Sequence, residues 1–126
     1  MAVNEIFGWL WILVGFLSGL ALGLGFRGDD WLGGYGSFRR RLIRLGHISF
    51  LGLRILNLLF AFTGPRLALG EGALRLASWS WILGGISMPV CCALMAWRRG
   101  FHLLFGLPVA SLVLAAALTV FGVVRR

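Results

Sequence analysis

Long apolar runs separated by short polar segments dominate this chain. A transmembrane helix needs about 20 predominantly apolar residues to cross the hydrocarbon core of a bilayer. Four stretches meet this requirement, and we predict spans at Ile6–Phe26, Leu42–Thr63, Leu76–Trp97 and Phe101–Val124. The connections are short, so consecutive helices should pack antiparallel. The pattern predicts an all-α integral membrane four-helix bundle, with residues 1–126 forming a single transmembrane domain.

The composition agrees with this pattern. Hydrophobic residues make up 60% of the 126 positions and charged residues only 13%, too few to cover a water-soluble domain of this size. Glu5 precedes the first run and no basic segment does, which favours a retained helix over a cleaved signal peptide. We therefore exclude secreted and nucleic-acid-binding proteins, and the lipid bilayer is the first partner that the sequence predicts.

The charges are distributed unevenly between the two ends of the predicted bundle. All twelve basic residues are arginines, and the formal net charge is +8. On the side of the first and third loops we count Arg27, Arg39, Arg40, Arg41, Arg44, Arg98 and Arg99, and on the opposite side Arg66, Arg75, Arg125 and Arg126. The positive-inside rule then predicts that both termini lie outside. Dual topology with antiparallel dimers is the alternative.

We predict the bacterial inner membrane as the location. The chain is compact and carries no recognised eukaryotic targeting signal.

The first predicted span carries Gly15, Gly19 and Gly23 at four-residue spacing. Glycines at this spacing let a second backbone approach closely, which is how many helices associate inside membranes. The pattern predicts close packing on this face. The neighbour is either another helix of the same bundle, which such motifs favour, or a second subunit.

Polar side chains follow one face of the second predicted span. At about 100° per residue, Arg40, Arg44, His47, Arg54 and Asn57 fall within roughly 140° of arc. Arg54 lies near the middle of the span, where an arginine costs about 2.5–3.5 kcal/mol on insertion scales. Its guanidinium cannot relieve this cost by deprotonating. Since no span offers a carboxylate, we predict that Arg54 needs another acceptor: Asn57, a free backbone carbonyl, a neighbouring subunit or a ligand.

The two histidines suggest a cofactor hypothesis. His47 and His102 both lie near the membrane surface on the side of the first and third loops. Two facing imidazoles can supply both axial ligands of a b-type haem, and Arg44 or Arg54 would then pair with the propionates. Their predicted depths differ by roughly 6 Å, at 1.5 Å of rise per residue. The alternative is that each histidine simply bonds water or lipid headgroups.

A row of sulfur atoms lies on one face of the third predicted span. Met88, Cys91, Cys92 and Met95 have the offsets 0, 3, 4 and 7. Thioether and thiolate ligands suit a soft metal such as Cu(I). The same residues also serve as ordinary apolar filling, which we favour here. Pro89, within this row, should free one backbone carbonyl of the helix.

No catalytic constellation occurs in the chain: we find no phosphate-binding loop and no nucleophile beside a base. The sequence therefore favours a non-enzymatic role, and the leading hypothesis is a non-catalytic subunit of a larger membrane assembly or homo-oligomer. A second hypothesis is a haem-binding electron carrier that uses His47 and His102. A third is a small oligomeric channel or transporter for an anion or a soft metal.

Overall fold

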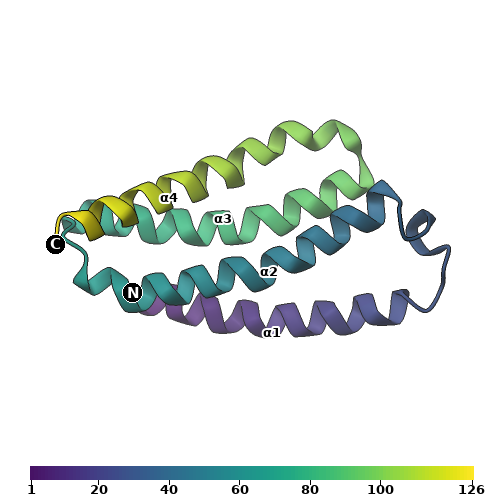
Figure 1. Cartoon of the computed structure of the whole chain (residues 1–126), viewed down its shortest axis with the longest axis horizontal. Helices are drawn as coiled ribbons and strands as arrows, with labels where there is room; N and C mark the ends of the chain where they lie inside the picture. The colour runs from purple at the N-terminus through teal and green to yellow at the C-terminus, as the bar shows by residue number, and fades with distance from the viewer.

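The computed structural model describes all 126 residues. It contains four long helices: α1 (Ala2–Gly25), α2 (Phe38–Thr63), α3 (Glu71–Trp97) and α4 (Gly106–Val124). Consecutive helices run antiparallel, and both termini lie at the same end of the molecule (Figure 1). All four helical segments are long and apolar enough to cross a membrane. The predicted all-α bundle of antiparallel neighbours with short loops is confirmed.

Three helices begin earlier than the predicted spans, because polar residues extend each of them beyond its apolar part. α2 begins at Phe38 rather than Leu42, since the Ser37 hydroxyl accepts a hydrogen bond from the Arg40 backbone N–H at 3.1 Å and caps the helix. α3 begins at Glu71, whose negative charge suits the first turn of a helix. α1 begins at Ala2.

The fourth span begins with a different type of helix from the α-helix that we predicted. Residues Arg99–Phe105 form a 3₁₀ helix, η3, and the α-helix proper begins only at Gly106. Pro108 therefore lies in the first turn of α4, where its missing N–H leaves no hydrogen bond unmade. His102 belongs to η3, which runs directly into α4 within the helical segment Arg99–Val124.

The main hydrophobic core lies at the end that holds the termini. A core of Phe60, Leu67, Ala77, Trp81 and Ala115 joins α2, the second loop, α3 and α4 there. The indole N–H of Trp81 also donates to the Thr119 hydroxyl at 3.3 Å.

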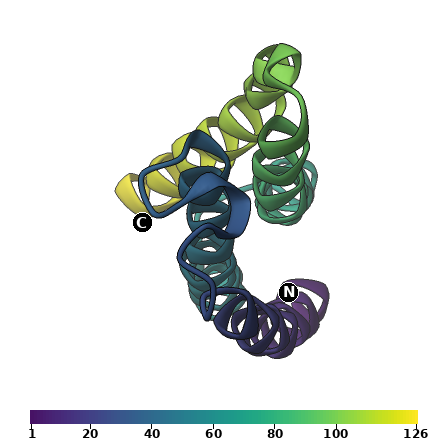
Figure 2. The same ribbon diagram turned by 90° about the vertical axis from the view of Figure 1, so that its right-hand side faces the viewer.

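The four helices do not close into a ring. Seen end-on, they follow one another around an open curve, with α1 against α2 and apart from α4 (Figure 2). α2 therefore has two packed sides, one against α1 and one against α3.

A buried hydrogen-bond network ties α1, α2 and α3 together near the termini. Asn4 and Asn57 are both 0% exposed, and the Asn4 amide N–H group donates to the Asn57 side-chain oxygen at 3.0 Å. It also donates to the Ser78 carbonyl at 3.1 Å, while the Ser78 hydroxyl donates back to Asn4. Asn57 in turn donates to the carbonyls of Leu53 and Trp81. Every amide group in the network has a partner.

Pro89 provides a second link between α1 and α3. Because proline has no N–H, the carbonyl four residues before it, that of Gly85, loses its helical donor. The indole N–H of Trp11 donates to this carbonyl at 3.1 Å. Gly85 also lets α1 approach, since a Cβ there would lie 2.9 Å from the Phe7 ring. The carbonyl predicted to be freed is thus bonded by a neighbouring helix.

Candidate functional site

The packed interface between α1 and α2, which we call the seam, holds two of the polar residues singled out from the sequence. Arg54 and His47 both point from α2 toward glycines of α1. A Cβ added at Gly15 would collide with the Arg54 guanidinium, and one added at Gly19 would lie 3.0 Å from the His47 ring. Gly23 has nothing within 4 Å. Two of the three spaced glycines therefore make room for polar side chains of the same bundle.

Arg54 is only 5% exposed, yet its hydrogen bonding is incomplete. Its sole hydrogen bond runs from Nη1 to the Ile12 backbone carbonyl, and it is long at 3.5 Å. The guanidinium carbon also lies 5.5 Å from the centre of the Phe16 ring, a cation–π contact. A guanidinium carries five N–H donors. The chain itself thus leaves most of the hydrogen-bonding capacity of Arg54 unused.

A cavity beside Arg54 opens on the seam. It measures about 330 Å³, and its lining includes Arg54, His47 and Gly15. The lining also includes Phe16 and Leu20, which are largely exposed on the outer surface, and Leu51, which is 39% exposed. A neighbouring cavity of about 300 Å³ shares His47 and Gly19 and reaches Arg44. The seam is therefore a furrow with cationic side chains inside it.

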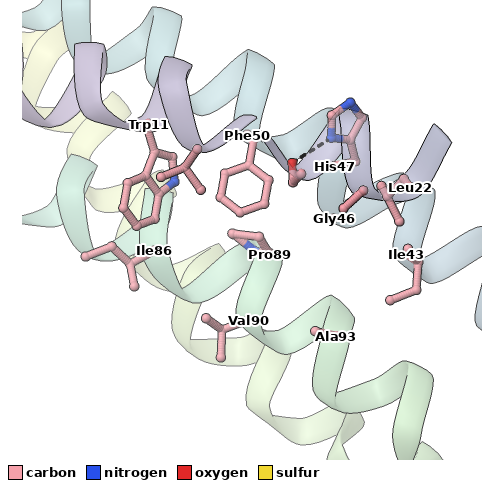
Figure 3. Close-up of a pocket in the computed structure, with 13 residues that line it drawn as sticks. Trp11, Leu22, Ile43, Gly46, His47, Phe50, Ile86, Pro89, Val90 and Ala93 are labelled. Carbon is pink, nitrogen blue, oxygen red and sulfur yellow. Dashed lines mark hydrogen bonds between the residues drawn. The ribbon is translucent and has the colours of Figure 1, made fainter. Parts of the chain in front are cut away.

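His47 has a partner within the chain. Its Nδ1 lies 3.0 Å from the Ser18 hydroxyl, as the dashed line in Figure 3 shows. The Ser18 hydroxyl donates its proton to the Gly15 carbonyl. Because the Ser18 hydroxyl uses its one proton for Gly15, it can only accept a hydrogen bond from the His47 ring. This geometry makes Nδ1 the donor to Ser18, and Nε2 has no hydrogen-bond partner within the chain.

The other members of the polar face of α2 belong to different environments. Arg40 is buried at the first loop, where it donates to the Asp29 carbonyl at 3.2 Å and lies over the Phe26 ring at 4.6 Å. Arg44 lies over Tyr35 and donates to its carbonyl at 3.2 Å. Asn57 belongs to the network with α3. The residues predicted to share one polar face of α2 thus lie in three environments. Arg40 and Arg44 contact the first loop, His47 and Arg54 lie in the seam, and Asn57 belongs to the network.

The two histidines are not brought together. His47 lies in the seam beside α1, whereas His102 is exposed on η3, which packs against α3 and α4. His47 lines three cavities, and His102 contributes to none of them. This placement gives no support to a haem held between the two imidazoles.

The two thiols in the sulfur row face different neighbours. The Cys91 thiol donates to the Leu104 carbonyl of η3 at 3.4 Å. Cys92 faces α2, with its Cβ 3.2 Å from the position that a Cβ on Gly46 would take. Nowhere in the chain do three His, Cys, Asp or Glu side chains gather in a way that could hold a metal ion. The thiols pack the interfaces of α3.

We expect both cysteines to resist a membrane-permeant thiol reagent in the folded protein, because Cys91 is 4% and Cys92 0% exposed. Labelling should become complete only after denaturation, as mass spectrometry of the intact chain would show. A Leu103→Cys variant supplies the control, since this η3 position is exposed and its thiol should react at once. Rapid modification of the native cysteines in the folded protein would contradict the packing described here.

The second concave feature lies between α1, α2 and α3, where α1 and α3 diverge. This cavity, which we call the groove, measures about 450 Å³ and is almost entirely apolar. Figure 3 shows Trp11 at one end of the groove, Phe50 and Pro89 in the middle, and Ile43 and Ala93 toward the other end. Its volume falls within the range of small-molecule sites. No sequence pattern indicates this groove, because it arises where α1 and α3 diverge.

Comparison with protein-family models, with curated proteins and with solved structures found no match to this chain. The seam and the groove are the two features of the fold that a partner or ligand could contact. The seam offers hydrogen-bond donors within a candidate membrane span, and the groove offers an apolar surface that leads toward the arginine-rich end.

Proposed function

We propose that this protein is a non-catalytic subunit of a larger membrane assembly, and that the seam contacts a transmembrane helix of the partner. The observation that carries the proposal is Arg54, which is buried in α2 with a single long hydrogen bond. A charged side chain at this depth normally pairs with another group or faces a polar cavity. An acceptor on a partner helix would complete the hydrogen bonding of Arg54.

The shape of the seam supports this proposal. The cavity beside Arg54 is large enough for a side chain to enter from outside. Phe16 and Leu20 border it and are 67% and 66% exposed, so a partner helix would find apolar contact area around the polar centre. Buried polar contacts surrounded by apolar packing are the usual means by which membrane helices associate.

Photo-crosslinking tests the proposal. A photoreactive amino acid at Phe16 in the tagged chain, irradiated in native membranes, should yield a protein adduct of defined mass. Arg54→Leu should reduce that adduct at least tenfold, because the partner loses its polar contact. Arg54→Lys should retain part of it, since the positive charge remains.

The matched control is the same photoreactive group at Val113, which is 62% exposed on α4, away from the seam. That position should give no adduct that depends on Arg54. An adduct of twice the chain mass would identify a second copy as the partner. If Phe16 crosslinks only to lipid, or if its protein adduct is unchanged by Arg54→Leu, the proposal is wrong.

A further inference from the structure

A third concave feature lies at the end of the bundle that carries the first and third loops. It is a cavity of about 440 Å³ whose lining includes Arg39, Arg99 and Ser37. Both arginines are exposed there, and Arg99 lies 4.6 Å from the centre of the Phe38 ring. No carboxylate contributes to the lining. The cavity is therefore a cationic pocket at the membrane surface.

This cationic pocket adjoins the apolar groove. A smaller cavity of about 310 Å³ lies between them and shares Arg39, Ala96 and Trp97 with the pocket. It also shares Ile43 and Ala93 with the groove. The three cavities form one path along α2 and α3, which is cationic at the surface and apolar further in.

The length of the path corresponds to one leaflet of a bilayer. From Arg39 to Phe50, α2 rises about 16 Å, at 1.5 Å per residue. The hydrocarbon core of a bilayer is about 30 Å thick, so a path of this length extends from the membrane surface no further than roughly halfway across it. Trp97, which is 84% exposed at the polar end, is placed as indole rings are at membrane interfaces.

We propose that this path is a binding site for one anionic phospholipid. The headgroup phosphate would lie between Arg39 and Arg99, and one acyl chain would follow the groove past Ala93 toward Phe50. Arginine forms charge-assisted, bidentate hydrogen bonds with phosphate. The first backbone N–H groups of α2, at Phe38 and Arg39, lie at the same place, and the start of a helix favours an anion.

A net negative headgroup is favoured over a zwitterionic one. With no acid in the lining, a choline or ethanolamine group would meet only arginines of its own sign. The proposal does not depend on a partner at the seam, because neither Arg54 nor Phe16 lines the path.

Native mass spectrometry of the full chain in detergent tests the proposal, with phosphatidylglycerol and phosphatidylcholine of identical acyl chains as probes. We expect one tightly retained phosphatidylglycerol. An arginine near the membrane surface changes the affinity for anionic lipid by roughly fivefold. Arg39→Gln and Arg99→Gln should each weaken phosphatidylglycerol binding by about that factor, and leave the weaker binding of phosphatidylcholine unchanged.

One further variant tests the acyl-chain part of the path, and a second serves as the control. Ala93→Trp would fill the path and should weaken both lipids, with circular dichroism confirming that the helices remain. Arg75→Gln, at an exposed arginine of α3 near the opposite end, is the matched control and should change neither. Equal affinity for the two lipids in the parent chain, or equal loss in Arg75→Gln and Arg39→Gln, would overturn the proposal.

Discussion

Replacing Arg54 by leucine is expected to lower the apparent free energy of insertion of the second span by roughly 3–4 kcal/mol. Insertion scales assign about +2.5 to +3.5 kcal/mol to arginine at the centre of a helix and a small negative value to leucine. The fraction of full-length chains with this span inserted, measured through glycosylation sites placed in the flanking loops, reports the change. Arg54 would then be the largest single obstacle to the insertion of α2.

Arg41→Leu is the matched control for this measurement. Arg41 is exposed in the first turn of α2, where a charge lies near the interface, and its removal should change insertion by less than about 1 kcal/mol. An equally small effect of Arg54→Leu would show that Arg54 lies outside the bilayer centre. That result would also remove the physical reason for a partner at the seam.

Contacts within the folded chain offset little of the insertion free energy that Arg54 costs. One hydrogen bond of 3.5 Å and a contact of 5.5 Å with the Phe16 ring are weak compensation for an arginine at membrane depth. Arg54→Leu should therefore make insertion of the isolated chain more favourable and weaken its binding to the partner. A residue that only stabilised this bundle would have the opposite effect on the isolated chain.

The four spans could be predicted from the sequence because each is a long apolar run with its own turn signals. The polar face of α2 was also visible, since helical periodicity places its residues on one side. Its division among three environments was not visible. Arg40 lies in the first turn of α2 and packs against the first loop. Ser37 caps the helix one turn earlier than predicted, which places Arg40 beside Phe26.

The partners of the polar residues could not be inferred from the sequence. Asn4 lies ahead of the apolar run and looks like an exposed terminal residue, and Ser78 looks like a small helical residue. Their importance depends on Asn57, which is 53 positions from Asn4. The groove was equally hidden, because it depends on the divergence of α1 and α3. Periodicity identifies the face of a helix but not the neighbour that covers it.

Replacing Asn57 by leucine is expected to lower the free energy of unfolding by roughly 2–4 kcal/mol. The two side chains are similar in size, so the effect comes from the hydrogen bonds to Asn4, Leu53 and Trp81. Interhelical hydrogen bonds in membranes contribute about 0.6–2 kcal/mol each, and a buried group left without a partner costs about 1–3 kcal/mol. Unfolding of the purified protein in mixed micelles measures the change.

Ser49→Ala is the local control, because the Ser49 hydroxyl bonds only to the Gly46 carbonyl of its own helix. It should change the free energy of unfolding by less than about 0.5 kcal/mol, as most substitutions outside such networks do. A double-mutant cycle of Asn4→Ala and Asn57→Ala then isolates the link between α1 and α2. Groups in direct contact show coupling energies of about 0.5–3 kcal/mol. If the two substitutions are additive, Asn4 and Asn57 do not bond in the membrane, and α1 is held to the bundle by the seam and by its hydrogen bonds to α3 at Ser78 and Gly85.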